Sequence, residues 1–355
     1  MHQLNQVIQE IKPLNENAIL KTLNHLNQLT KPPGSLGRLE DLAKQISGIS
    51  HETVPDLSKK AVVVMAADHG VCEEGISAFP QEVTPQMVYN FLNSGAAINV
   101  LARQANAEVF CVDIGVKGKL DHPNLIQKKV KPGTDNMAKQ AAMSIDEALQ
   151  AVLVGVEVVE ELVEKGYKVV ATGEMGIGNT TASAAILTAL TSLEIEHAVG
   201  RGTGINDEMW KHKQNVVKSA LEINQPNPKN ALDVLAKVGG LEIAGLVGVI
   251  LGAAKARIPV VIDGFISSAA ALVAYKLCST SVQFMIPSHL SQEHGHQFML
   301  QEMGLTPMLH LDMRLGEGTG AALCFQLIDA SLNIMSEMAT FESAGVSGAT
   351  EEEVE

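Results

Sequence analysis

The stretch YKVVATGEMGIGNTTASA, residues 167–184, places an apolar β-strand, a glycine loop and the start of a helix in immediate succession. From Gly173 it reads G-x-x-x-x-G-N-T, whereas a nucleoside-triphosphate loop reads G-x-x-x-x-G-K-[ST]. Asn179 therefore occupies the position of the lysine that reaches the outer phosphates. We expect such a loop to hold one phosphate at the helix N-terminus, without processing a triphosphate.

Strands and helices alternate along the rest of the chain. Expected strands, most of them continuously apolar, lie at 61–67, 108–115, 168–173, 259–264, 282–287 and 308–313. Helical stretches are expected at 84–105, 138–165, 179–191, 206–222, 240–255, 264–278 and 291–303. This alternation predicts a parallel sheet covered on both faces. The expected fold is a three-layer α/β/α arrangement around a mainly parallel, six-stranded, Rossmann-like sheet.

The two ends of the chain contain helical patterns but no convincing strand. We therefore expect residues 1–55 and 325–347 to form a small helical domain beside a large α/β domain at 56–324. The acidic end of the chain, residues 348–355, is expected to be a disordered tail.

Composition narrows the class of partner. The 355 residues include 40 acidic and 26 basic side chains, giving a net charge of -14, which disfavours nucleic acid and anionic membranes as partners and favours small molecules. The four cysteines are widely spaced, and the N-terminus lacks the apolar segment of a signal peptide, so we expect a cytoplasmic protein. The apolar run at 244–254 is too short to span a membrane and is expected to be a buried helix.

Glycine-rich or polar sequence follows nearly every expected strand, at the edge where open parallel sheets bind ligands. Gly176 and Gly178 can turn backbone N–H groups toward an anion, although they could also serve only a tight turn. A second glycine loop, GRGTG at 200–204, carries Arg201, which can pair with phosphate or carboxylate, and its presence favours binding.

Two glutamates near these loops are candidate acid–base groups. Glu317 lies between glycines in LGEGTG, just after an expected strand, where a substrate could approach closely and lose a proton. Alternatively, Glu317 could complement the dipole of the next helix. Glu174 is open to the same two interpretations.

Histidines raise the possibility of a metal site. His289, His294 and His296 are clustered, and His69 follows Asp68, but neither H-E-x-x-H nor a cysteine pair is present. We therefore favour structural histidines at the strand edge and expect no metal or cofactor. The absence of G-x-S-x-G, and of G-x-G-x-x-G after the first strand, gives no support to a serine hydrolase or a nicotinamide dehydrogenase.

Eight motifs together resemble one family, the nicotinate-nucleotide:dimethylbenzimidazole phosphoribosyltransferases, in register from about residue 15 to residue 347. The motifs are LTKPPGSLGRLEDLA (29–43), AADHGVCEEGISAFPQEVT (66–84), GEMGIGNTTASAA (173–185), VGRGTGIND (199–207), DGFISSAAAL (263–272), SHLSQEHGH (288–296), LDMRLGEGTGAAL (311–323) and MATFESAGVS (338–347).

The resemblance implies a reaction of cobalamin biosynthesis. Ribose 5-phosphate would pass from nicotinate mononucleotide to 5,6-dimethylbenzimidazole with inversion at the anomeric carbon, without a cofactor, in a homodimer. Glu317 matches the general base of the family, and Glu174 is the candidate for a second carboxylate near the ribose or the base.

Carried over residue by residue, the resemblance also assigns the remaining site. Expected phosphate and donor contacts are Gly176, Ile177, Gly178, Asn179, Arg201, Gly202, Lys213, Ser291 and Arg314. The expected slot for the acceptor base is Phe79, Pro80, Met87, Met175 and Leu315, although these could be ordinary core residues. A nucleotide-binding regulatory protein without turnover and a metal-dependent hydrolase remain the alternative functions.

Overall fold

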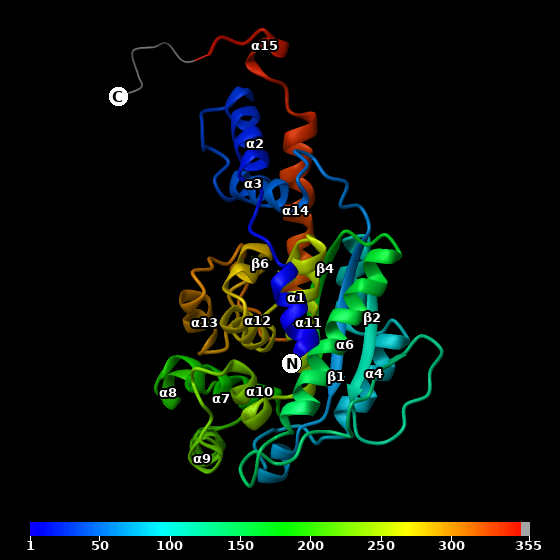
Figure 1. Cartoon of the computed structure of the whole chain (residues 1–355), viewed down its shortest axis with the longest axis vertical. Coiled ribbons are helices and arrows are strands. Elements are labelled where there is room, and N and C mark those ends of the chain that lie inside the picture. The colour runs from blue at the N-terminus through cyan, green and yellow to red at the C-terminus, as the bar shows by residue number, and fades with distance from the viewer. Residues whose placement is uncertain (349–355) are drawn as a thin grey trace. The chain divides into compact units, whose positions relative to one another are not determined.

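The computed structural model describes residues 1–348 of the chain, and its centre is a six-stranded, all-parallel sheet (Figure 1). The strand order is β3-β2-β1-β4-β5-β6. The strands are β1 (Lys60–Ala67), β2 (Ala107–Gly115), β3 (Ile126–Gln127), β4 (Val169–Met175), β5 (Val260–Ile262) and β6 (Met285–Pro287). The order reverses between β1 and β4, and ligands of such sheets bind beyond the carboxyl ends of strands at that point.

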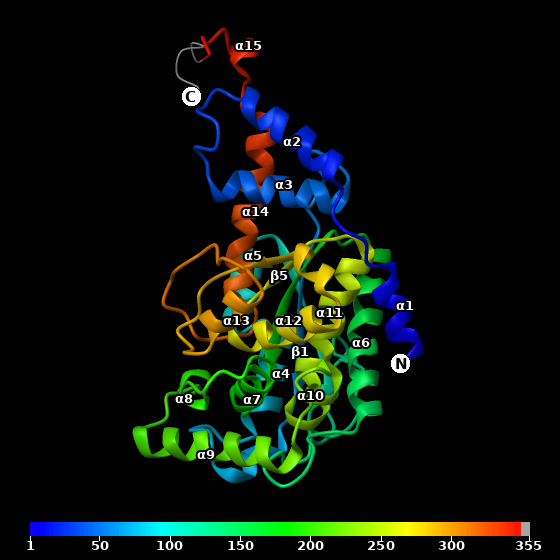
Figure 2. The same ribbon diagram turned by 60° about the vertical axis from the view of Figure 1, so that its left-hand side comes forward.

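Helices cover both faces of this sheet. Figure 1 shows α4 (Val83–Leu92) and α6 (Ile145–Glu164) on opposite sides of β1 and β2, and Figure 2 shows α6, α11 (Leu241–Ala256) and α12 (Phe265–Leu277) together on one face. The three-layer, Rossmann-like fold expected from the sequence is thereby confirmed. The helices of this part are α1 (His2–Glu10), α4 (Val83–Leu92), α5 (Ala97–Gln104), α6 (Ile145–Glu164), α7 (Asn179–Thr191), α8 (Ile195–Ala198), α9 (Asp207–Asn224), α10 (Ala231–Val238), α11 (Leu241–Ala256), α12 (Phe265–Leu277), α13 (His296–Glu302) and α14 (Thr319–Glu337), with short 3-10 turns η1 (Gly70–Glu74) and η2 (Ser279–Phe284).

The central strands are fixed by their apolar side chains. Every residue of β1, KAVVVMAA, is buried, and β1 pairs in register with β4 from Lys60 opposite Val169 to Ala66 opposite Met175. On one face α11 packs against α6 so closely that a Cβ on Gly155 would lie 1.9 Å from the carbonyl oxygen of Gly245. The apolar run at 244–254 is therefore a buried helix, as expected.

Several expected boundaries are wrong for identifiable reasons. The run 308–313 is not a strand: it makes one isolated bridge, His289 to Leu309, and its residues 310–312 are exposed. The two-residue strand β3 was not foreseen. The helix expected at 84–105 breaks at Ser94, whose φ is +61°, and the helix expected from 138 begins only at Ile145, where Ser144 and Glu147 form a capping box.

The remaining expected elements differ less from the structure. The run 282–287 is a strand only from Met285, and the helix expected from 291 begins at His296. The helix expected at 179–191 has those bounds in the structure.

The chain divides into two compact units, and the helical unit holds both a segment near the N-terminus and the C-terminal segment. The larger unit is Met1–Lys12 with Ser58–Cys324, and the smaller is Pro13–Leu57 with the chain from Phe325 on. The smaller unit contains α2 (Glu16–Gln28), α3 (Arg38–Ser50), α14 from Phe325 to Glu337, and α15 (Phe341–Ala344). Its core includes Leu26, Leu29, Ala43 and Met335.

The first twelve residues thus group with the large unit, whereas the sequence pattern predicts them in the small helical domain. Leu4 and Val7 of α1 are buried, and α1 packs against α11. Among residues 1–348, no helix is long and apolar enough to cross a membrane. The expected acidic tail lies outside the described residues, apart from residue 348.

Candidate active site

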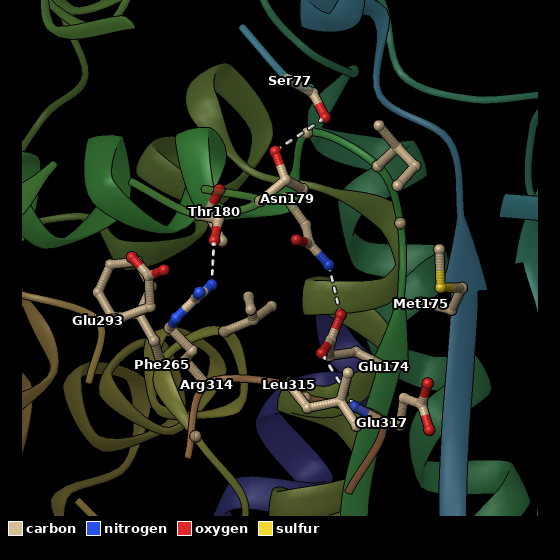
Figure 3. A pocket seen from close by; sticks show the side chains of 18 of the residues that line it. Ser77, Glu174, Met175, Asn179, Thr180, Phe265, Glu293, Arg314, Leu315 and Glu317 are labelled. Atoms are coloured by element: carbon tan, nitrogen blue, oxygen red, sulfur yellow. Dashed lines mark hydrogen bonds between the residues drawn. The ribbon is translucent and has the colours of Figure 1, made fainter. Parts of the chain in front are cut away.

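A cavity of about 480 Å³ opens at the carboxyl ends of β4, β5 and β6. Its walls are the loops that follow these strands, the 76–79 segment, part of α4, and the glycine loops around Gly202 and Glu317. Figure 3 shows Thr180 and Glu293 on one side, Glu317 on the other, and Glu174 between them. The cavity therefore lies where the topology of the sheet predicts a ligand.

One side of the cavity has the features of an anion site. Gly178, with φ +97°, precedes α7, and the positive end of the α7 dipole favours an anion at this N-terminus. The Nζ of Lys213 donates to Thr180 Oγ1 at 2.8 Å, and Arg314 Nη1 donates to the carbonyl oxygen of Gly202 at 3.2 Å. A helix N-terminus and two cations thus converge on this side.

Lys213 is exceptional because its ammonium group is almost completely buried. It is 1% exposed, and burial lowers the pKa of Lys213 from 10.5 to about 8, against the opposing effect of nearby Glu293. Glu293 is also buried, and desolvation raises its pKa. One oxygen of Glu293, Oε2, has no hydrogen-bond partner among the described residues. Water therefore cannot solvate the charged forms of Lys213 and Glu293.

Ser291 lies at the same edge, positioned by a neutral histidine. Its backbone N–H donates to His296 Nδ1 at 2.8 Å, and His296 Nε2 pairs with Ser268 Oγ at 2.8 Å. Because Nδ1 accepts, the ring proton lies on Nε2. Burial lowers the pKa of His296 to about 3, so the ring is a neutral structural group.

Glu317 occupies the opposite side of the cavity in a left-handed backbone conformation. Its φ is +64°, between Gly316 and Gly318 at +86° and +95°, and such a conformation costs a non-glycine residue about 1–3 kcal/mol. Its Oε2 accepts the backbone N–H of Ile98 at 3.2 Å at the start of α5, whereas Oε1 accepts no hydrogen bond from the described residues. Burial raises the pKa of Glu317, which makes it a stronger base than an exposed carboxylate.

The approach of the Glu317 loop to the sheet explains a glycine in the opening motif. A Cβ on Gly173 of β4 would lie 2.4 Å from the carbonyl oxygen of Glu317, so only glycine fits there. Thus the GEMG motif accommodates the GEGTG motif from the far end of the chain.

Glu174 connects the two sides. Its carboxyl accepts from the side-chain amide of Asn179 and, through Oε1, from the backbone N–H of Glu317 at 3.3 Å. Burial raises the pKa of Glu174 to about 8, and the neighbouring carboxylates of Asp263 and Glu242 act in the same direction. Glu174 is therefore largely protonated at neutral pH.

The cavity also has an apolar part. Phe79, Met87, Met175 and Leu315 line it, and Phe79 and Leu315 are 53% and 58% exposed. Large apolar side chains left this open at a cavity are suited to covering a flat apolar ligand.

Comparison with known proteins identifies the family. A family profile described as "Phosphoribosyltransferase" matches residues 11–346. The chain is 51% identical over 352 residues, 99% of each chain, to a nicotinate-nucleotide–dimethylbenzimidazole phosphoribosyltransferase of Halalkalibacterium halodurans. It is 53% identical to the protein of that name in Chloroflexus aggregans, over 98% of this chain and 99% of the relative. A crystal structure of CobT from Thermus thermophilus superimposes with a TM-score of 0.90 at 45% identity, covering 94% of this chain and 100% of that one.

The chain belongs to the nicotinate-nucleotide–dimethylbenzimidazole phosphoribosyltransferase family. The resemblance seen in the eight motifs is confirmed, and the protein is a phosphoribosyltransferase. A phosphoribosyl group carries one phosphate and one reacting carbon. Membership in this family therefore relates the anion site on one side of the cavity to Glu317 on the other.

For this phosphoribosyltransferase, the structure gathers most residues assigned from sequence into one cavity. Those that line it are Glu174, Glu317, Gly176, Ile177, Gly178, Asn179, Gly202, Lys213, Ser291, Arg314, Phe79, Met87, Met175 and Leu315. Pro80 and Arg201 do not line it. The Arg201 guanidinium pairs with Asp207 and lies 5.3 Å from the ring centroid of Trp210, in a neighbouring hollow.

Other residues of the cavity were not singled out from the sequence. They include Ser77, Thr180, Thr203, Asp263, Phe265, Ser267 and Glu293. Asp263 had the clearest signal, because it is the first polar residue after an apolar strand in PVVIDG. Thr180 belongs to the glycine loop itself.

The histidines do not form a metal cluster in residues 1–348, where no three histidine, cysteine, aspartate or glutamate side chains are placed to hold an ion. Both ring nitrogens of His296 are hydrogen-bonded, His294 lies against His197 with ring centroids 6.0 Å apart, and His69 Nε2 bonds Glu242 Oε1 at 2.6 Å. The metal-dependent hydrolase alternative gains no support from these contacts.

Proposed function

We propose that this phosphoribosyltransferase moves the 5-phosphoribosyl group of nicotinate mononucleotide to 5,6-dimethylbenzimidazole, giving α-ribazole 5′-phosphate and nicotinate. The observation that carries the proposal is the pairing, within one cavity, of a buried anion site around Lys213 with a carboxylate, Glu317, that has one free oxygen. The curated relatives are named for these two substrates.

The phosphate of the donor would lie at the N-terminus of α7, within reach of Lys213 and the glycine loop at Gly202. A phosphate there would restore the full charge of Lys213, because a nearby anion favours the protonated amine. In a nucleoside-triphosphate loop, a lysine at the position of residue 179 would reach the outer phosphates. Its absence here accords with a donor whose single phosphate is bound and is not transferred.

The acceptor base would lie against the apolar side chains around Phe79 and Leu315. One ring nitrogen attacks the anomeric carbon of the ribose from the face opposite the pyridinium. The new carbon–nitrogen bond forms as the bond to the pyridinium nitrogen breaks, and that electron pair leaves with nicotinate, whose ring becomes neutral. Attack from the opposite face inverts the anomeric configuration from β to α.

Glu317 would remove the proton that attack makes acidic. As one nitrogen of the benzimidazole bonds to carbon, the ring becomes cationic, and its other N–H would give its proton to Glu317 Oε1. The bond from Ile98 N–H holds the second oxygen, so the free oxygen keeps one direction. General-base catalysis of this kind contributes about 10²- to 10⁴-fold, and correct positioning of both rings must supply much of the rest.

Glu174, largely protonated, would act as a neutral hydrogen-bonding group beside the ribose. The Asn179 amide can turn so that its oxygen accepts the carboxyl proton of Glu174, and the donor would then meet no second negative charge beside its phosphate. Arg314 and Ser291 would complete the donor site, and Arg201 would join only after leaving Asp207.

The test is a reaction of the protein with nicotinate mononucleotide and a panel of azole bases. Nicotinate should be released only when a base is present, and NMR of the riboside phosphate should show the α configuration. Release of nicotinate without a base, or a β product, would refute the proposal. A protein that binds the donor but never turns over would be the non-catalytic nucleotide-binding alternative.

We also propose that the large unit carries the catalytic site while the enzyme works in the cytoplasm as a homodimer. Light scattering on the purified protein tests the dimer, and a mass of one chain, 37.7 kDa, would refute it.

A further inference from the structure

Asp263 is a buried carboxylate that has no role in the reaction proposed above. It follows β5, is 2% exposed and lies at the cavity wall. Its Oδ2 accepts the backbone N–H of Gly318 at 3.2 Å, and its Oδ1 accepts that of Ala321 at 3.0 Å. Both oxygens therefore bind the chain immediately after Glu317, where α14 begins.

The loop that carries Glu317 requires support from its surroundings, because residues 316, 317 and 318 all adopt positive φ angles. Left-handed backbone at a non-glycine residue persists only where the surroundings impose it. Besides Asp263, other bonds hold the loop. Glu317 N–H donates to Glu174 Oε1 at 3.3 Å, Glu317 Oε2 accepts Ile98 N–H at 3.2 Å, and Thr319 donates to the carbonyl oxygen of Gly316 through both Oγ1, at 2.8 Å, and its backbone N–H, at 3.1 Å. Asp263 receives two backbone N–H groups from this loop, and these bonds are charge-assisted whenever the carboxylate is ionised, although burial raises the pKa of Asp263.

Asp263 is itself fixed to the sheet. Its backbone N–H donates to Thr172 Oγ1 at 3.1 Å in β4, and His289 Nδ1 lies 4.0 Å from Oδ1. Burying a carboxylate costs free energy, which its hydrogen bonds partly offset. An apolar residue at this position could not make these bonds. The bonds of Asp263 transmit the rigid position of β4 and β5 to the loop that carries Glu317.

The geometry points to Asp263 as the positioning residue of the catalytic base: it holds Glu317 in its strained conformation with Oε1 aimed at the acceptor. This inference rests on the proposed role of Glu317. Asp263 acts through Glu317 and not by contact with the reacting atoms.

The first test is Asp263→Asn, which keeps the shape but turns an amide N–H₂ toward one of the two backbone N–H groups. We expect kcat to fall about 10- to 100-fold, because small misplacements of a catalytic group cost up to about 10²-fold, while KM for nicotinate mononucleotide changes less than about 3-fold. The matched control is Asp113→Asn. Asp113 is equally buried at the end of β2 and accepts Val116 N–H at 2.9 Å, but it lies outside the cavity, so its kcat should not change.

A double-mutant cycle separates positioning from a general structural role. In a Glu317→Gln background, Asp263→Asn should lower kcat by less than about 3-fold, because the group being positioned no longer works as a base. An equal loss in both backgrounds, or an unchanged kcat in the single variant, overturns the inference. Wild-type protein that forms no riboside phosphate would instead be a failure of the proposed function.

If Asp263→Asn does not fold, the pair Thr172→Val and Thr172→Ser carries the test. Valine removes the hydroxyl that accepts the backbone N–H of Asp263 at 3.1 Å, and serine keeps it. We expect the valine variant alone to lower kcat, and this loss too should vanish in the Glu317→Gln background. Equal rates for valine and serine would overturn the inference.

Discussion

Replacing Lys213 with methionine should stabilise the ligand-free protein while it destroys donor binding. Burial lowers the pKa of Lys213 from 10.5 to about 8. A difference of about 2.5 pKa units corresponds to about 3 kcal/mol by which the charged lysine destabilises the folded state at neutral pH. Methionine keeps the length of the side chain but loses the bond to Thr180, worth about 1 kcal/mol, and leaves Glu293 without its cation. The expected net gain is about 1–2 kcal/mol at pH 7.

The stability difference between wild type and Lys213→Met should depend on pH, because Lys213 loses its proton at a lower pH in the folded state than in the unfolded state. Between pH 8 and 10.5, the unfolded lysine keeps its proton while the folded one has lost it, so the unfolded state binds more protons. Wild-type stability should therefore rise with pH across this window relative to the variant. The advantage of Lys213→Met should be full below pH 8, fall by about 3 kcal/mol as the pH rises to 10.5, and reverse near that pH, because the lost bond to Thr180 remains.

Unfolding should be followed by circular dichroism in urea at pH 7 and at pH 10, with nicotinate mononucleotide binding measured by calorimetry at pH 7. Lys218→Met is the control, because Lys218 lies on the same helix α9 with its side chain 64% exposed. That control should show neither the gain nor the loss of binding. A Lys213→Met protein less stable than wild type at pH 7, or a stability difference equal at both pH values, would refute the reasoning.

Three further substitutions test residues of the cavity. Glu317→Gln should lower kcat at least about 100-fold with little change in KM for nicotinate mononucleotide, measured by nicotinate release; an unchanged kcat would remove Glu317 from the mechanism. Glu174→Gln should keep kcat within about 3-fold at pH 7, because burial raises the pKa of Glu174 to about 8 and glutamine mimics the neutral acid. The same variant should gain stability over wild type as the pH rises from 4.5 to 8, since the folded carboxyl holds its proton while the unfolded one releases it; a constant difference in urea unfolding would contradict this. Phe79→Ala should raise KM for dimethylbenzimidazole about 10-fold and leave unfolding unchanged, because Phe79 is 53% exposed without the ligand; equal effects on both substrates would argue against a base slot.

The sequence predicted the sheet well where strands are buried on both faces. The runs that became β1, β2 and β4 are mostly apolar, and every residue of β1 and six of the seven residues of β4 are buried, which favours strands covered on both faces. It failed at 308–313, where Leu311 and Asp312 are exposed and a single bridge forms. An apolar run of that length carries no information about whether a neighbouring strand edge is available.

Site residues were foreseen where glycines frame them, as at Glu317, and missed where long-range packing decides their role. Glu293 pairs electrostatically with Lys213 across eighty residues of sequence, and nothing in SQEHGH indicates that contact. Asp263 binds a loop more than fifty residues later in the chain. Spacing along the sequence reports local structure, whereas Asp263 meets the start of α14, and Glu293 meets Lys213 of α9, only in the folded chain.

The ionisable groups of this site are all buried, and their burial links the stability of the protein to the proposed chemistry. Burial moves Glu174, Glu293 and Glu317 toward their neutral acids, and it moves Lys213 toward its neutral amine, as the direction of each pKa shift indicates. The cavity by itself is thus a place where charges are costly, and a donor that brings a phosphate and a pyridinium supplies the missing counter-charges. A phosphate stabilises the protonated Lys213, whereas the acceptor N–H meets a Glu317 whose raised pKa makes it better able to take the proton. Binding of ribose 5-phosphate, which brings the phosphate without the pyridinium, should therefore be accompanied by proton uptake at Lys213 near pH 8. Calorimetry in two buffers with different ionisation enthalpies would detect this uptake, and equal heats in the two buffers would contradict the argument.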